Sequence, residues 1–187
     1  MPAVEASLDR FRAAHTQVLG VSVDSVHCHA NWAKDLGGIS FPLLADFNPK
    51  GALAQSLGLY LEKAGITDRA TVIIDSGGTV RHASSVTPAG RRDIAALAAL
   101  CEEIDKASST PREPFAPPPG VPEGATLYIK SQCGFSRATL LAMENLHLTG
   151  KVPVRNINDD PAAKETLLRI AGKATAPCPA IGATPLQ

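Results

Sequence analysis

A proline-rich segment divides this sequence and limits what it can fold into. Residues 106–124, KASSTPREPFAPPPGVPEG, carry six prolines and few side chains that a core could bury. Because proline removes a backbone donor and favours extended chain, this composition is typical of a partly extended linker. A chain of 187 residues can form one large domain or two small ones. We therefore expect two domains, residues 1–105 and 125–187, joined by a linker at 106–124.

The first of these parts alternates helix and strand patterns. Apolar spacing, turn residues and β-branched runs predict, in chain order, a helix at 4–14, a strand at 17–23, a helix at 26–36, an extended segment at 41–46, a helix at 48–58, a hairpin at 70–85 and a helix at 91–104. Asn48 is expected to cap the fifth of these elements, with Pro49 in its first turn. Strands that alternate with helices indicate an α/β fold.

The second part shows the same alternation of strand and helix patterns over fewer residues. It predicts a strand at 126–130, a helix at 134–148, a strand at 152–157, a helix at 161–171 and a tail with one short strand. Asp160 before Pro161 marks the start of the last helix, and Gly172 marks its end. The predicted order is therefore β-α-β-α followed by a loop.

Charge and cysteine content exclude several classes of function. The 18 basic and 18 acidic residues cancel, which gives no electrostatic reason to expect nucleic acid or an anionic membrane as a partner. No apolar run reaches the length of about 20 residues that a transmembrane helix needs, and residues 1–10 lack the pattern of a secretory signal. The four cysteines are too scattered for a disulfide framework. We expect a cytoplasmic protein whose thiols are core residues or catalysts.

Cys133 is the cysteine with the most specific surroundings. It follows a predicted strand and opens a predicted helix, where unpaired N–H groups and the helix dipole stabilise a thiolate. Lys130 can add a positive charge, and Ser136 stands where a dithiol enzyme would carry its second sulfur. The alternative is that Cys133 is an ordinary small buried residue. We expect an activated thiol.

The second part resembles the glutaredoxin family of the thioredoxin fold. The likeness rests on Lys130, on CGFS at 133–136, on VRNIND at 154–159 and on TAP at 175–177. CGFS is the motif of the monothiol branch of that family. The loop between Lys130 and Cys133 is shorter than in family members that hold an iron–sulfur cluster, and the sequence ends soon after the TAP motif.

This resemblance implies a site built around one sulfur. Pro177 would follow a cis peptide and face Cys133, and the residues that hold glutathione would be Lys130, Phe135, Thr175, Ala176 and Pro177. A Cys133 thiolate would attack a glutathione mixed disulfide or a protein disulfide, and an external thiol would resolve the product, because Ser136 cannot. Cys178 is expected in the core, with a role as second thiol left open.

Two other uses of this part stay open. Cys133 could be one ligand of an iron–sulfur cluster, since thiolates are the usual ligands of such clusters. Alternatively, the second part could be a non-catalytic module that docks partners. We expect no other metal site, because the consecutive residues His27, Cys28 and His29 point in different directions on a helix.

The first part resembles the peroxiredoxin family. The likeness lies in VLGVSVDSVHCHANWAKDLGGISFPLLAD at 18–46 and in RATVIID at 69–75. It implies that Arg69 would stabilise a peroxidatic thiolate and polarise a peroxide. The family carries a Thr-x-x-Cys motif at the start of a helix that corresponds to residues 2–11 here, but no such motif precedes these residues, and it would fall just before Met1. The sequence is therefore interpreted as a fragment or as a degenerate peroxiredoxin, with peroxide a substrate only if that cysteine is supplied.

The remaining cysteines receive secondary roles. Cys28 is a candidate resolving thiol, and Cys101 is expected in the core. Taken together, the sequence predicts an α/β chain with two thioredoxin-fold domains, peroxiredoxin-like and glutaredoxin-like. The expected function is thiol–disulfide exchange in antioxidant defence, with a homodimer left open.

Overall fold

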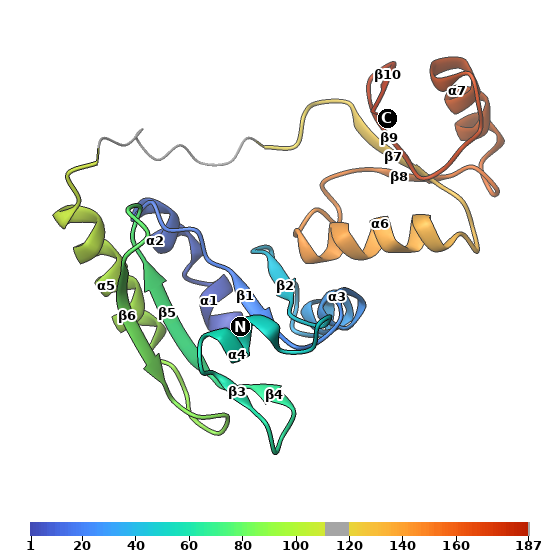
Figure 1. Cartoon of the computed structure of the whole chain (residues 1–187). Helices are drawn as coiled ribbons and strands as arrows, with labels where there is room; N and C mark the ends of the chain where they lie inside the picture. The colour runs from blue at the N-terminus through green and yellow to red at the C-terminus, as the bar shows by residue number, and fades with distance from the viewer. Residues whose placement is uncertain (111–119, 187) are drawn as a thin grey trace. The chain divides into compact units, whose positions relative to one another are not determined.

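The computed structural model of the chain describes residues 1–110 and 120–186 (Figure 1). Most of the predicted linker, residues 111–119, lies outside the described residues. Contacts between Cα atoms divide the chain into two compact units, Met1–Trp32 with Ile39–Ala116 and Ala33–Gly38 with Pro117–Gln187. Both units mix helices and strands, in agreement with the predicted α/β class.

The first unit pairs its strands two by two. Strands β1 and β2 are parallel, whereas β3 with β4 and β5 with β6 form antiparallel pairs. The elements up to residue 110 are α1 (Pro2–Glu5), α2 (Leu8–Ala13), β1 (Gly20–Ser22), α3 (Val26–Asp35), β2 (Leu43–Ala45), α4 (Ala52–Ser56), β3 (Tyr60–Leu61), β4 (Ile66–Thr67), β5 (Ala70–Ile74), β6 (Val80–Ser85) and α5 (Ile94–Ala107). All of them belong to the first unit except the end of α3, from Ala33 on, which is assigned to the second. The sequence analysis does not predict the short pair β3–β4, and the helix expected at 4–14 is divided into α1 and α2.

A small apolar core lies where α2 packs against α5. Phe11, Ala14, Ala98 and Cys101 are buried together, and Ile73 of β5 packs against them. Burial raises the pKa of the Cys101 thiol, which keeps it protonated and unreactive at neutral pH. The prediction that Cys101 is a core residue is confirmed.

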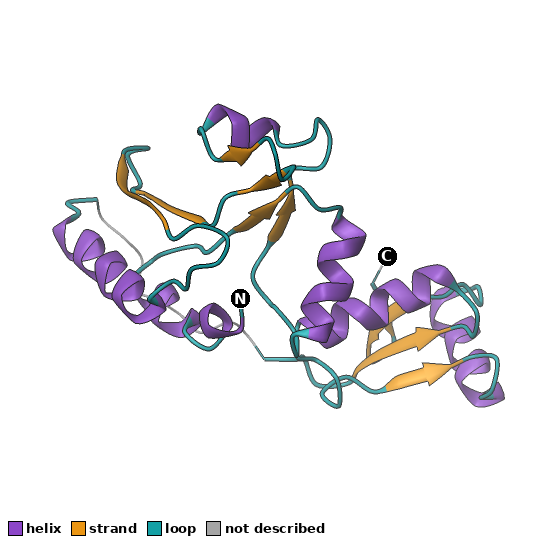
Figure 2. Ribbon diagram, turned by 90° about the horizontal axis from the view of Figure 1, so that it is seen from below, coloured by secondary structure: helices purple, strands orange, loops and turns teal. Residues whose placement is uncertain are grey.

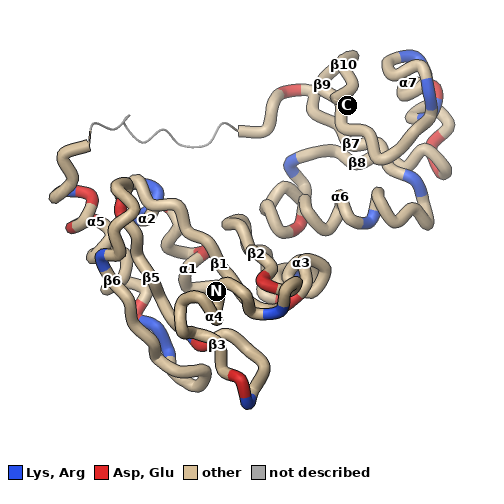
Figure 3. Tube along the Cα trace, in the orientation of Figure 1, with Lys and Arg blue, Asp and Glu red and all other residues tan. Residues whose placement is uncertain are grey.

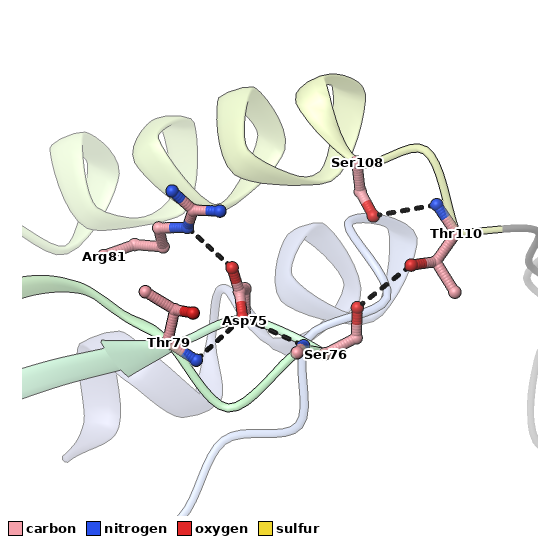
Figure 4. Close-up of polar contacts among 7 residues, drawn as sticks. Asp75, Ser76, Thr79, Arg81, Ser108 and Thr110 are labelled. Atoms are coloured by element: carbon pink, nitrogen blue, oxygen red, sulfur yellow. Dashed lines mark hydrogen bonds and ion pairs between the residues drawn. The ribbon is translucent and has the colours of Figure 1, made fainter.

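The turn between β5 and β6 is built around Asp75 (Figure 4). Its Oδ1 accepts hydrogen bonds from the N–H groups of Gly77 and Thr79, both at 2.9 Å, and its Oδ2 accepts one from Arg81 Nε at 2.6 Å. The N–H of Thr79 and then Arg81 hold the pKa of Asp75 below its ordinary value. The predicted hairpin and its glycine turn are confirmed, with Gly78 at φ +82°.

The predicted start of the helix at 48–58 is wrong. The Asn48–Pro49 peptide is cis, residues 47–51 form a turn, and α4 begins at Ala52. Asp46 supplies the cap instead, because its two carboxylate oxygens accept the N–H groups of Leu53 at 3.0 Å and Ala54 at 2.9 Å. These are the N–H groups that a helix start leaves unpaired.

The second unit contains one four-stranded sheet. The strand order is β10-β9-β7-β8, with β8 parallel to β7 and β9 antiparallel to it. Its elements are β7 (Ala125–Ile129), α6 (Gly134–Asn145), β8 (Val154–Asn156), α7 (Pro161–Ala171), β9 (Cys178–Ile181) and β10 (Thr184–Pro185). Where one short strand was expected in the tail, the structure has the hairpin β9–β10.

The helix α7 begins and ends where its caps predict. The Asp160 carboxylate accepts the N–H of Ala163 at 3.0 Å, Pro161 lies in the first turn, and Gly172 ends the helix at φ +69°. Figure 2 shows the helices of this unit beside its sheet. Leu167 of α7 is fully buried in a core with Tyr128, which anchors the helix on the sheet.

The described residues include no helix long and apolar enough to cross a membrane. Acidic and basic residues are interspersed along both units (Figure 3).

Candidate thiol site

Cys133 stands at the junction of a strand and a helix. It is the N-cap of α6, with φ −100° and ψ 118°, and its carbonyl oxygen accepts the N–H of Arg137 at 3.0 Å. The Cys133 Sγ lies 3.9 Å from the carbonyl oxygen of Ala176, to which the S–H can donate a weak hydrogen bond. The structure thus brings together two segments that are 43 residues apart in sequence.

The surroundings of Cys133 favour its thiolate. The backbone N–H of Ser136 lowers the pKa of the Cys133 thiol, followed by the Ser136 hydroxyl, the N–H of Phe135 and the charge of Lys130, while desolvation raises it. Hydrogen bonds from the first turn of α6 therefore contribute more than Lys130. This is the effect expected of a cysteine at a helix start.

Ser136 occupies the position of an absent second thiol and has a role of its own. Its side chain is buried, and its Oγ accepts the backbone N–H of Lys130 at 3.1 Å. Since that bond uses an oxygen lone pair, the hydroxyl hydrogen remains available to the Cys133 sulfur. Ser136 therefore connects the end of β7 to the thiol.

The other residues predicted to hold glutathione lie on both sides of Cys133 in sequence. The Ala176–Pro177 peptide is cis, as the glutaredoxin resemblance implies. Thr175 is exposed and Ala176 is buried. Phe135 directs an apolar ring into solvent, with 79% of its surface exposed. This set combines a thiol, the backbone of residues 175–177 and an exposed aromatic ring.

Cys178 belongs to the core. It pairs with Tyr128 across β9 and β7, and its side chain is buried with Leu167 and Ala176. Its Sγ lies 3.6 Å from the carbonyl oxygen of Pro179. Burial raises the pKa of the Cys178 thiol, although Lys173 opposes this shift. The expectation that Cys178 points into the core is confirmed.

Two asparagines that the sequence did not single out hold the loop before Cys133. Asn158 Oδ1 accepts the N–H of Ser131 at 2.9 Å, and Asn156 Nδ2 donates to Ser131 Oγ at 2.7 Å. Both residues lie in the VRNIND segment, which the sequence marks only through its resemblance to glutaredoxins. No local pattern predicts a contact across 25 or more residues.

In the first unit, Arg69 has a neighbour that the sequence did not reveal. Arg92 is partly buried, and it donates from Nη2 to the carbonyl oxygen of Ala70 at 2.6 Å and from Nε to Thr71 Oγ1 at 2.9 Å. Burial and then the charge of Arg69 lower the pKa of Arg92. Arg69 itself is exposed. Because its charge acts on Arg92, the two guanidinium groups lie in the same region of the first unit.

Cys28 lies on α3 and is exposed. The described contacts include no hydrogen bond between Cys28 and Arg69. The adjacent His29 is buried and its Nε2 lies 2.7 Å from Ser22 Oγ, so the two residues point in different directions, as predicted. Within residues 1–110 and 120–186, no group of three or more His, Cys, Asp or Glu side chains is arranged to hold a metal ion.

Comparison with known protein families matches two separate parts of the chain. The model of the AhpC/TSA family matches residues 1–83, and the model of the glutaredoxin family matches residues 125–183. The chain joins a peroxiredoxin-like region to a glutaredoxin-like domain. The predicted fold class is thereby confirmed, while the bounds 1–105 and 125–187 stay predictions.

Curated relatives match the peroxiredoxin-like region. Alkyl hydroperoxide reductase E of Mycobacterium tuberculosis is 39% identical over 86 residues, which cover 46% of this chain and 56% of the relative. Peroxiredoxin-4 of Bos taurus is 38% identical over 91 residues, which cover 45% of this chain and 32% of the relative. The chain therefore spans less than two thirds of the length of these relatives.

Solved structures of similar fold agree with this result. AhpC of Mycobacterium bovis has a TM-score of 0.52 and 25% identity, over 58% of this chain and 61% of that one. AhpC of Mycobacterium tuberculosis has a TM-score of 0.50 and 27% identity, over 55% of this chain and 62% of that one.

Proposed function

We propose that this chain is a thiol–disulfide oxidoreductase of antioxidant defence, in which Cys133 exchanges disulfides with glutathione. The observation that carries the proposal is the placement of Cys133, a half-exposed thiol at the start of α6 whose pKa is lowered by the first helical turn. A thiolate is the attacking species in disulfide exchange, so this environment favours the reaction.

The reaction we propose has two steps. The Cys133 thiolate attacks the glutathione sulfur of a mixed disulfide, which forms a Cys133–glutathione disulfide and releases the other sulfur as a thiolate that takes up a proton. A second glutathione thiolate then attacks the glutathione sulfur of this adduct. The products are oxidised glutathione and the regenerated Cys133 thiolate.

Three groups are proposed to hold glutathione during these steps. The Thr175–Pro177 segment offers backbone donors and acceptors beside the sulfur, Phe135 offers an exposed apolar surface, and Lys130 offers a charge for a carboxylate. An iron–sulfur cluster fits these residues less well. Cys133 supplies one thiolate where such clusters use four ligands, and Cys178 is buried.

The test is reduction of a mixed disulfide of glutathione and a small thiol, in the presence of reduced glutathione and of glutathione reductase with its reduced nicotinamide cofactor. The full chain should turn over this substrate, and Cys133→Ser should lose the activity completely. Cys28→Ser serves as the control, because that thiol is exposed on α3, outside the glutaredoxin-like domain, and its loss should leave turnover unchanged. If Cys133→Ser retains the activity of the unchanged chain, the proposal is wrong.

For the peroxiredoxin-like region we predict no fast peroxidase reaction from this sequence. Arg69 and its neighbour Arg92 can polarise a peroxide, but no Thr-x-x-Cys nucleophile for them to assist precedes the first helix of this sequence. Hydrogen peroxide consumption should be slow and unchanged by Arg69→Ala, with Arg81→Ala as the matched control. A fast reaction that collapses in Arg69→Ala alone would show that Cys28 acts as the peroxidatic thiol.

A further inference from the structure

The residue before Cys133 has an unusual backbone conformation. Gln132 has φ +55°, a left-handed value that only a few per cent of non-glycine residues adopt. Gln132 links the end of β7 to the N-cap of α6, so its φ determines how Cys133 is presented to the helix. A conformation of this kind persists only when the surrounding contacts hold it.

Those contacts converge on Ser131, the residue before Gln132. Its N–H donates to Asn158 Oδ1 at 2.9 Å, and its hydroxyl oxygen accepts a hydrogen bond from Asn156 Nδ2 at 2.7 Å. One residue is thus held through both its backbone and its side chain. Asn156 is the last residue of β8, and Asn158 lies in the connection between β8 and α7.

The two asparagines are themselves held in place. Asn156 Nδ2 donates a second hydrogen bond to Asp159, and Asn156 Oδ1 accepts the N–H of Asn158 at 3.1 Å. Asn156 pairs with Ile129 across the parallel strands β8 and β7, and the N–H of Ile157 bonds the Ile129 carbonyl oxygen at 2.9 Å. The pairing of β8 with β7 therefore fixes Asn156 and Asn158 relative to the strand that precedes Cys133.

We propose that Asn156 and Asn158 are positioning residues of the thiol site. By holding Ser131 they keep Gln132 left-handed, and they thereby keep the Cys133 sulfur at the N–H groups of the first turn of α6. Their described bonds go to Ser131, Asp159 and each other, so they act through the loop and not on the sulfur. The inference rests on the proposed function only in taking disulfide exchange with glutathione as the reaction of this thiol.

The test is Asn158→Leu in the full chain, which removes the acceptor at similar size and without a change of charge. Lys130, the cation that acts on Cys133, remains. The control is Thr166→Val, which removes an exposed bond of 2.8 Å from a side chain to the backbone of α7. Trypsin cuts after Lys130 and Arg137, so the Cys133 peptide can be followed by mass while alkylation is measured against pH.

Because the thiolate reacts, the alkylation rate rises with pH through the pKa of Cys133, and the unchanged chain should have a midpoint below about 8.5. In Asn158→Leu we expect this midpoint to rise by about 0.5 to 1 unit, so that alkylation at pH 7 slows about 3- to 10-fold. Thr166→Val should not move it. Ser131→Ala, which removes the bond from Asn156, should shift it in the same direction.

A second substitution separates positioning from general loosening. Since glycine adopts positive φ readily, adding Gln132→Gly to Asn158→Leu should recover at least half of the lost rate at pH 7. An unchanged midpoint in both Asn158→Leu and Ser131→Ala overturns the proposal, as does a shift that Gln132→Gly does not reduce. The alkylation measurement needs no glutathione. If the variants shift the midpoint as expected but the unchanged chain does not exchange disulfides with glutathione, the proposed function is wrong and the positioning role of the asparagines still holds.

Discussion

Oxidised glutathione should add one glutathione to this chain, at Cys133, and Cys133→Ser should abolish the adduct. The Cys133 thiolate attacks one sulfur of oxidised glutathione, forms the mixed disulfide and releases one glutathione thiolate. The adduct should persist after excess reagent is removed, because Ser136 offers no sulfur and the Cys178 thiol is buried with a raised pKa. Intact mass at pH 7 measures the yield, and peptide mass locates the adduct.

Cys178→Ser is the decisive companion variant. If glutathione is the resolving thiol, the variant and the unchanged chain should carry the same stable adduct. An adduct that persists only in Cys178→Ser, with a Cys133–Cys178 disulfide in the unchanged chain, would make Cys178 the second thiol. Such a bridge needs Cα atoms within about 7 Å. Absence of any adduct would contradict glutathione-linked exchange.

Leu167→Ala should destabilise the glutaredoxin-like domain by about 2–5 kcal/mol, the usual cost of removing a buried leucine side chain. Leu167 has no exposed surface and lies in the core between α7 and the sheet. Cys178 lies in the same core, so its thiol becomes accessible to a labelling reagent when this core opens. The urea concentration at which half of Cys178 is labelled should be lower in Leu167→Ala than in the unchanged chain.

The neighbouring Leu168 is a matched control, because 44% of its surface is exposed. Leu168→Ala should change the stability by no more than about 0.5–1 kcal/mol. Cys101 lies in the core of the peroxiredoxin-like region, and its labelling should be the same in both variants. Equal protection of Cys178 in Leu167→Ala and in the unchanged chain would contradict this account of the core.

Features with local causes could be predicted from the sequence. The bounds of α7 follow from Asp160, Pro161 and Gly172, which act on the backbone within one turn. The hairpin turn at Asp75 is another case, since its acceptor and donors are at most six residues apart. Placement of a thiol at a helix start likewise needed only the order of strand, cysteine and helix.

Features that depend on distant partners could not be predicted in this way. Asn48 and Pro49 have the pattern of a helix start, but the Asp46 carboxylate caps the helix later. The contacts of Asn156 and Asn158 with Ser131 exist only because β8 lies beside β7. These side chains carry no local mark of their role, so the support of the thiol site became visible only in the folded chain.

The burial of Cys101 and Cys178 gives this chain a practical advantage for spectroscopy. With Cys28→Ser, the only cysteine thiol that is not buried within residues 1–110 and 120–186 is that of Cys133. A nitroxide or a fluorophore can then be attached beside the Ala176 carbonyl without rebuilding either core. Its mobility would report how freely the segment that ends in Pro177 moves.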